Sequence, residues 1–208
     1  MIGPGSFWSS DTPSGEGYSY RIDSRQSSYL SIPTEAQLNN LKDFTISWWM
    51  KLSSVDGNTD RIFSTRASHE AGEGYLDLIA RSDTPGHLDL EFVFSNGHHN
   101  GRTAVRIDNL KADEWLFLAL VRDAATGELK VYSCPAVRTA VMKVSDHPAN
   151  RATNINNSPS TDMLIGGYPG DSKNRTPDGL FYDWRFYREA LAPAAITTVF
   201  TQGLNGQE

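Results

Sequence analysis

The sequence predicts an all-β protein, a jelly-roll sandwich of two antiparallel sheets with one short helix near the C-terminus. Alternating apolar and polar segments recur roughly every 8–15 residues, and turn-forming residues separate them. Only one segment has a convincing helical periodicity. With 208 residues, of which 38% are hydrophobic, one such domain can bury a complete core.

The segment from Phe44 to Leu52 carries the strongest strand signal. Its residues alternate between two sets, which predicts that one set faces the core. The first set is Phe44, Ile46, Trp48 and Met50, and the second is Thr45, Ser47, Trp49 and Lys51. Residues 115–122 are apolar at both parities, which indicates a central strand buried on two sides.

Further strands are expected at 29–32, 61–65, 75–80, 88–94, 128–132, 163–165 and 180–187. In the fourth of these, alternation predicts one set inside and another outside; the inner set is Leu88, Leu90, Phe92 and Phe94, and the outer set is Asp89, Glu91 and Val93. In the last, alternation places these residues on one side: Leu180, Tyr182, Trp184 and Phe186.

The predicted helix covers residues 194–201. It follows Pro193, a good first-turn residue, and Ile196, Val199 and Phe200 share one face. Gly203 is expected to end it. The polar stretch 145–161 is expected to be irregular.

Residues 1–19 are predicted to form an N-terminal arm, and residues 20–208 one domain. The arm is rich in Gly, Ser and Pro, so its composition alone indicates loose order. Its aromatic residues can pack on its own sandwich or on a neighbouring subunit; they are Phe7, Trp8, Tyr18 and Tyr20. We therefore expect an arm that takes part in assembly, and a homo-oligomer.

Composition also limits the partners and the compartment. The formal net charge is −6 and no basic stripe occurs, so nucleic acid and anionic membranes are not expected as partners. No apolar run approaches ~18 residues, and the first residues lack the basic and apolar regions of a secretory signal. The single cysteine, Cys134, cannot form an internal disulfide and is expected to be a packed or edge thiol.

Five motifs, in order, resemble those of laminin-G-like, concanavalin-A-like jelly rolls. Residues 43–51 resemble the strand FTISFWVK, and residues 114–123 and 127–132 resemble the hairpin that follows in the family. Residues 164–167 resemble the LxIGG strand, and residues 179–191 resemble FxGxIDEVRIYNRAL. The resemblance covers about residues 20–203 and implies the same fold, which hosts lectins, enzymes and structural modules.

The opening of the domain carries a narrower resemblance. Residues 18–23 and 27–31 resemble the start of jelly-roll proteins found in tailed-phage virions. This resemblance implies a virion-surface protein, made in the cytoplasm without a signal peptide, whose partners include other virion or surface subunits. Outside that setting, the expected location is extracellular, by an unrecognised route.

Carboxylates in the catalytic pattern of this fold are not evident. Glycosidases of this fold place acids in an ExDxxE-like run on one strand. Asp89 and Glu91 share a strand face, but Val93 occupies the next position. A solvated outer face explains these two acids. The acids Glu70, Glu73 and Asp77 form the other cluster, and the first two lie in an expected loop.

Lyase and metal signals are also weak. The Arg/Glu-rich and Gln-x-His strands of alginate-lyase-like enzymes do not occur, and the pair His98–His99 has no evident third partner. Laminin-G-like domains often hold a rim calcium ion with the first acid of their IDEVRIY strand. Here Tyr182 takes that position and Asp183 the next, which puts the usual site in doubt. We expect no cofactor; turn chemistry explains the oxygen-rich segment 56–60, which lacks the distal Glu of an EF-hand loop.

Glycan binding requires aromatic platforms beside planar polar groups. Two loops and one strand offer these residue types; the candidates are Trp49, His98, His99, Asn100, Arg102, Tyr168, Asp171, Lys173 and Asn174. Simpler explanations exist for two of them. Trp49 can be a second-layer core aromatic, and Tyr168 can cover an apolar edge beside a Pro-Gly turn.

The sequence thus favours a non-catalytic recognition or assembly module. The main hypothesis is a virion or surface-displayed structural protein with lectin-like capacity to bind a glycan or a cell-surface receptor. One alternative is a carbohydrate-binding module of a polysaccharide-degrading system. A glycosidase or lyase of the same fold is the less favoured alternative.

Overall fold

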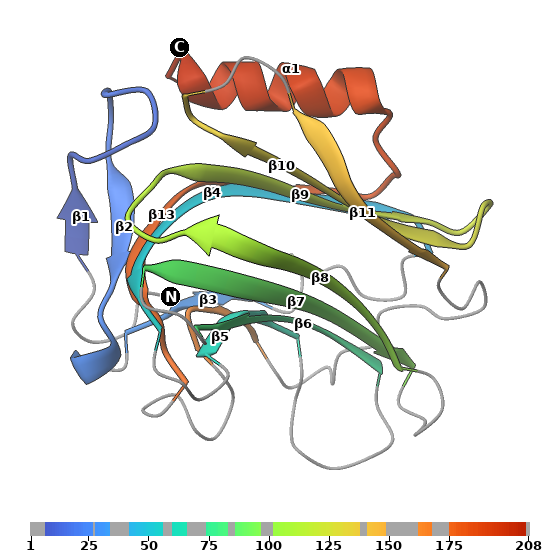
Figure 1. Cartoon of the computed structure of the whole chain (residues 1–208), viewed down its shortest axis with the longest axis horizontal. Helices are drawn as coiled ribbons and strands as arrows, with labels where there is room; N and C mark the ends of the chain where they lie inside the picture. Colours follow the sequence, from blue (N-terminus) through green and yellow to red (C-terminus); the bar gives the residue numbers. More distant parts are fainter. Residues whose placement is uncertain are drawn as a thin grey trace.

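A computed structural model of the chain shows a β-sandwich with one α-helix on an outer face (Figure 1). The described residues are 7–26, 28–33, 42–55, 60–65, 74–82, 86–96, 102–137, 141–148, 162–167 and 175–206. Within them the strands form a seven-stranded and a six-stranded antiparallel sheet. The predicted fold class, an all-β sandwich with a short C-terminal helix, is confirmed.

The seven-stranded sheet has the order β1-β2-β13-β4-β9-β10-β11. Its strands are β1 (Phe7–Ser9), β2 (Ser19–Ile22), β13 (Asp178–Tyr187), β4 (Phe44–Ser54), β9 (Leu116–Asp123), β10 (Glu128–Pro135) and β11 (Met142–Pro148). The six-stranded sheet has the order β3-β12-β5-β6-β7-β8. Its strands are β3 (Leu30–Ile32), β12 (Met163–Ile165), β5 (Asp60–Ser64), β6 (Gly74–Arg81), β7 (His87–Asn96) and β8 (Arg102–Lys111). A 3-10 turn covers Ser24–Gln26, and α1 covers Pro193–Leu204.

The main core lies between the two sheets. Strands β4 and β7 contribute the residues that alternation predicted, with Trp48 and Phe92 almost fully buried. Trp48 stacks on Trp184 of β13, with ring centroids 4.7 Å apart and planes inclined by 5°. Phe63 of β5 lies against the same indole at 5.8 Å. These rings join the sheets at their centre.

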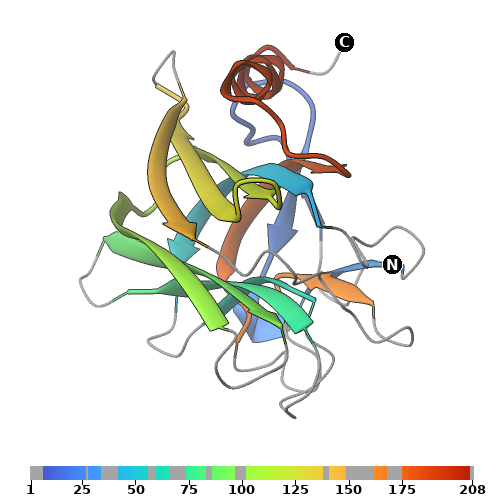
Figure 2. The ribbon, with the colours of Figure 1, turned by 90° about the vertical axis from the view of Figure 1, so that its right-hand side faces the viewer.

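A second core lies between the seven-stranded sheet and α1 (Figure 2). Trp49 of β4 is fully buried there, 5.4 Å from Phe117 of β9 and 5.3 Å from Phe200 of α1, measured between ring centroids. Ile196 and Val199 complete the buried side of the helix, as its periodicity predicted. Burial of each large apolar side chain contributes about 1.5–3 kcal/mol, so this face holds α1 firmly.

Two cores explain why β9 is apolar at both parities. Leu116, Leu118 and Leu120 lie in the core between the sheets. Phe117, Ala119 and Val121 lie in the core under α1. The prediction of a central strand buried on two sides is therefore confirmed.

The expected alternation along β13 is wrong beyond Tyr182. The register with β4 shifts between Tyr182 and Arg185, so one extra residue is inserted on β13. Asp183 takes a left-handed φ of 52° there, a conformation that Asp tolerates better than most residues. As a result Phe181 and Trp184 face the core between the sheets, whereas Tyr182 belongs to the core under α1.

Four of the observed strands were not predicted: β1, β2, β8 and β11. Three of them, β1, β8 and β11, lie at sheet edges. An edge strand pairs on one side only, and its residues need not be buried. In β8, Arg106, Asp108 and Asn109 are exposed, which conceals the period-two pattern. The expectation that 145–161 is irregular is wrong at 145–148, which belong to β11; residues 149–161 lie outside the described residues.

The described part of the N-terminal arm belongs to the sheet. Strand β1 pairs with β2 through Phe7↔Arg21, Trp8↔Tyr20 and Ser9↔Ser19, and β2 pairs in turn with β13. Tyr20 is buried in the main core, so this aromatic packs on its own sandwich. Trp8 and Tyr18 are exposed, and the side chain of Phe7 lies outside what the structure describes.

The prediction that Gly203 ends the helix is wrong: Gly203 lies inside α1, against Trp49. A Cβ added at Gly203 would lie 2.2 Å from Trp49 Nε1, which forces a shift. Gly203→Ala should therefore lower the free energy of unfolding by about 1–3 kcal/mol in chemical denaturation, because the crowded core must open.

Helix propensity alone predicts the opposite sign, since Ala is more favourable than Gly by about 1 kcal/mol inside a helix. Thr198→Ala is the matched control, because Thr198 lies on the exposed face of α1 and should change stability little. A stabilised G203A protein would contradict the close packing of α1 on Trp49.

Candidate functional site

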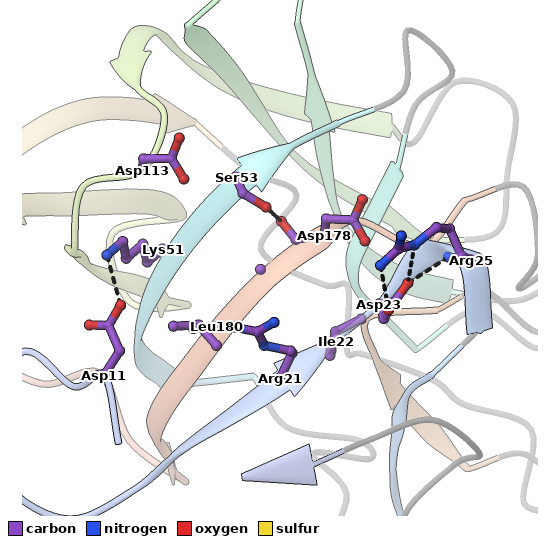
Figure 3. A pocket seen from close by; sticks show the side chains of 11 residues that line it. Asp11, Arg21, Ile22, Asp23, Arg25, Lys51, Ser53, Asp113, Asp178 and Leu180 are labelled. Atoms are coloured by element: carbon purple, nitrogen blue, oxygen red, sulfur yellow. Dashed lines mark hydrogen bonds and ion pairs between the residues drawn. The ribbon is translucent and has the colours of Figure 1, made fainter. Parts of the chain in front are cut away.

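An open cleft of about 410 Å³ lies on the outer face of the seven-stranded sheet, beyond the residues that α1 covers. Figure 3 shows the side chains that line it. Its walls come from the β1–β2 hairpin, the end of β4, the turn before β9 and the start of β13. The lining residues are Asp11, Arg21, Ile22, Asp23, Arg25, Lys51, Ser53, Asp113, Asp178, Gly179 and Leu180. Most of them carry a charge, and both signs are present.

Strand register places the floor of the cleft. Leu180 of β13 lies between Arg21 of β2 and Lys51 of β4, so one row across three strands holds a cation, an apolar side chain and a second cation. Neighbouring strands are about 4.8 Å apart, which puts the Cα atoms of Arg21 and Lys51 roughly 10 Å from each other. Such a row presents donors on both sides of an apolar strip.

Asp11 fastens the loop between β1 and β2 over this floor. Lys51 Nζ donates to Asp11 Oδ2 over 2.8 Å, and the indole Nε1 of Trp115 donates to Asp11 Oδ1 over 2.8 Å. Burial raises the pKa of Asp11, but these two hydrogen bonds and the charges of Lys51 and Arg21 outweigh it and hold the pKa below its ordinary value of 3.8. The carboxylate is therefore ionised in neutral solution and clasps the loop.

The far end of the cleft carries two further carboxylates. Arg25 forms an ion pair with Asp23 at 3.1 Å, and its hydrogen bond is the main reason why the pKa of Asp23 is lowered. Asp178 accepts hydrogen bonds from the backbone N–H of Ser24 at 2.7 Å and from its hydroxyl at 3.0 Å. These contacts fix the 3-10 turn after β2 against the start of β13.

This arrangement suits a hydroxyl-rich ligand. Carboxylates accept hydrogen bonds, and guanidinium and ammonium groups donate them. Together such acceptors and donors can bind the hydroxyl groups of a sugar. Across the part of the chain that the structure describes, no three His, Cys, Asp or Glu side chains are grouped to hold a metal ion.

A second cavity of about 460 Å³ adjoins the other side of the loop between β1 and β2. Its lining residues are Glu16, Gly17, Tyr18, Tyr182, Asp183 and Trp184. The ring of Tyr18 is 67% exposed, and Tyr182 is largely buried. Arg185 Nε donates a hydrogen bond to Asp183 Oδ1 over 2.8 Å. Burial lowers the pKa of Arg185, but the hydrogen bond to Asp183 contributes to a net rise of that pKa.

The strand acids considered for catalysis sit among arginines on the outer face of the six-stranded sheet. Glu91 is only 7% exposed, and it pairs with Arg81 at 3.0 Å and Arg106 at 3.8 Å. Asp77 is buried as well and pairs with Arg61 at 3.5 Å. A solvated outer face was therefore the wrong explanation for Glu91, because ion pairing accompanies its burial.

The structure tests only one of the ligand-binding candidates that the sequence offered. Trp49 as a ligand platform is wrong, because α1 covers its ring completely. Arg102 begins β8, but its side chain lies outside what the structure describes. The other candidates, which stay predictions, lie outside the described residues: His98, His99, Asn100, Tyr168, Asp171, Lys173 and Asn174.

The cleft residues were not singled out from the sequence. Lys51 was placed on the outward side of its strand, which was the one available signal. Arg21, Asp11 and Asp178 come from segments far apart in the chain, and only the sheet register brings them together. Cys134 is buried under α1, in agreement with a packed thiol.

Comparison with known proteins identifies the family. The profile of Laminin_G_3, described as the concanavalin A-like lectin/glucanases superfamily, matches residues 24–197. The chain belongs to this family. A search of curated proteins gave no match. In the part of the chain that the structure describes, no helix is long and apolar enough to cross a membrane.

Solved structures share the fold at low sequence identity. A heptameric SAP-like pentraxin from Limulus polyphemus has 18% identity and a TM-score of 0.53, covering 78% of this chain and 71% of its own. The CBM40 domain of a Ruminococcus gnavus IT-sialidase, bound to α2,3-sialyllactose, has 13% identity and a TM-score of 0.58, with 77% and 83% covered. The tailspike protein 2 of bacteriophage CBA120 has 9% identity and a TM-score of 0.67, covering 98% of this chain and 30% of its own.

Asp11→Asn should weaken the clasp on the β1–β2 loop. Because the folded-state pKa of Asp11 lies below 3.8, its stabilisation is present above that pH and is lost as the pH falls through the folded-state value. The free energy of unfolding should fall by less than about 1 kcal/mol at neutral pH, since the pair is half-exposed.

Denaturation of both proteins from neutral pH to well below 3.8 measures this difference. The two curves should converge in acid. Asp113→Asn, at an exposed acid of the same cleft, is the control. A difference between wild type and D11N that persists unchanged in acid would show that Asp11 acts through something other than its charge.

Proposed function

We propose that this chain is a non-catalytic carbohydrate-recognition module whose cleft beside the β1–β2 hairpin holds a glycan. The observation that carries this proposal is the open, charged cleft on a member of a lectin and glucanase superfamily. Arg21, Lys51 and Arg25 supply donors, and Asp113 supplies an exposed acceptor. Leu180 offers an apolar floor for the C–H face of a sugar ring.

The state of the carboxylates supports binding rather than catalysis. A glycosidase general acid needs a raised pKa so that it holds its proton near neutral pH. In the cleft, hydrogen bonds from cationic neighbours lower the pKa values of Asp11 and Asp23. Asp178 accepts two hydrogen bonds from Ser24 that hold the turn. These acids serve as anchors and acceptors.

The similar structures agree with this class of function. By their titles, they include a carbohydrate-binding module bound to sialyllactose and the binding domain of a botulinum neurotoxin. The toxin domain covers 97% of this chain, but this chain spans only 46% of it. The tailspike title names an enzymatically active domain, which is the reason to test for hydrolysis as well as binding.

A second role, assembly on a particle surface, has its own support. Strand β1 is an edge strand, and Trp8 on it is 62% exposed. An open edge with an aromatic side chain can pair with another chain. We place the protein on a virion surface as a homo-oligomer, with Trp8 and β1 at the contact between subunits; the glycan cleft would then be displayed outward.

Arg21→Ala should reduce the affinity for the glycan at least about tenfold. A hydrogen bond from a charged group contributes about 1.5–3 kcal/mol, and 1.4 kcal/mol corresponds to tenfold. A glycan array of neutral and acidic oligosaccharides first identifies the ligand of the wild-type protein, and isothermal titration then measures both proteins.

The control is Arg188→Ala, an exposed arginine between β13 and α1 that does not line the cleft. Equal loss of affinity in both variants would mean that general charge, and not the cleft, attracts the glycan. Release of reducing sugar from the bound oligosaccharide would overturn the non-catalytic proposal.

Trp8→Ala should shift the protein towards the monomer if β1 joins subunits, because it removes the exposed aromatic from the edge. Light scattering across a range of protein concentrations measures the mass of both proteins. A monomeric wild-type protein at all concentrations would contradict the assembly role and leave the cleft proposal untouched.

A further inference from the structure

The two cavities lie along the same strand, β13. The residues of β13 from Asp178 to Leu180 line the first, and those from Tyr182 to Trp184 line the second. The β1–β2 hairpin contributes to both, through Asp11 and Arg21 on one side and Glu16 to Tyr18 on the other. The β1–β2 hairpin and β13 therefore contribute to both cavities, although no single residue lines both.

The second cavity carries the residue types of a sugar subsite. Tyr18 presents an aromatic ring that is 67% exposed, and the neighbouring Glu16 is also exposed. A C–H face of a pyranose stacks on such a ring while a carboxylate accepts from its hydroxyls. Gly17 between them has a φ of 76°, and a Cβ there would meet nothing within 4 Å, so the space above this turn is open.

The β-bulge places the floor of this second cavity. The inserted residue at Asp183 ends the regular pairing of β13, and Arg185 holds the Asp183 carboxylate in place. Bulges commonly re-aim side chains beside binding sites. Here the bulged segment Tyr182, Asp183 and Trp184 lines the cavity together with Tyr18, although the side chain of Tyr182 packs under α1 and that of Trp184 packs between the sheets.

The spacing requires a ligand longer than one sugar ring. The midpoints of the two linings, Gly179 and Asp183, are four positions apart on β13, which corresponds to roughly 13 Å along a strand. The clasp from Asp11 to Lys51 and Trp115 fixes the loop that a bridging ligand must pass. A single sugar can fill one cavity, whereas only an oligosaccharide can reach both.

We propose that the cavity at Glu16, Tyr18 and Tyr182 is a second sugar subsite, so that the protein binds a linear oligosaccharide along β13 with one pyranose stacked on Tyr18. This inference rests on the proposed function of the first cleft. It adds that the ligand is an oligosaccharide and that Tyr18 contacts the sugar ring that lies outside the first cleft.

The test is isothermal titration of the wild-type protein with the disaccharide and the hexasaccharide of the backbone that binds on the array. The hexasaccharide should bind the wild type about tenfold more tightly per site. Tyr18→Ala should lose that tenfold preference and leave the disaccharide affinity unchanged. Tyr18→Phe keeps the ring and should retain the preference.

Val137→Ala is the control, since Val137 is 90% exposed, lines neither cavity and lies outside the proposed contact of β1. It should keep the wild-type preference per site, and circular dichroism should show all variants folded. Equal affinity of the wild type for both lengths, or equal behaviour of Y18A and V137A, would overturn the second subsite while the first cleft stands. If the wild type binds no glycan on the array, both proposals fall together.

Discussion

The packing of α1 on Trp49 is the constraint on which the rest of the structure depends. The outer face of the seven-stranded sheet carries Trp49 and Phe117, and exposing these apolar rings to water would cost free energy. The helix covers them, and Gly203 allows the backbone to approach the indole. Beyond the helix the same face ends in Lys51, Leu180 and Arg21, and there the cleft is open. One sheet face thus serves stability along most of its length, and the proposed function assigns recognition to its end.

The N-terminal hairpin completes this division. Its loop rises beside the C-terminal end of α1 in both views of the ribbon (Figures 1 and 2), and a Cβ at Gly206 would lie 3.1 Å from Glu16 Oε2. Asp11 ties the loop to β4 and to Trp115, which itself packs against the core under α1. The hairpin is therefore held both by sheet pairing and by one carboxylate. A segment that composition alone assigns to a loose arm thus contributes residues to both cavities.

Residue patterns predict the centre of this fold better than its margins. The alternation of β4 and the apolar character of β9 at both parities were predicted from the sequence. Both strands lie between two partner strands, so their burial imposes a clear hydrophobic pattern. The edge strands β1, β8 and β11 were not predicted, because pairing on one side imposes no such pattern. The single inserted residue at Asp183 reverses the faces of β13 beyond it, and no local pattern announces such an insertion. Trp49 was placed on the correct outward side, but whether a helix covers that side depends on tertiary packing. The cleft shows the same limit, since Asp11, Lys51 and Asp178 meet only after the sheet has formed.

The most direct test of the central claim is a crystal structure of the protein with the oligosaccharide that binds it best. The account predicts sugar density over Leu180, between Arg21 and Lys51, with α1 still seated on Trp49. Sugar density on the outer face of the six-stranded sheet, beside Arg81 and Arg106, would contradict the assignment of the cleft.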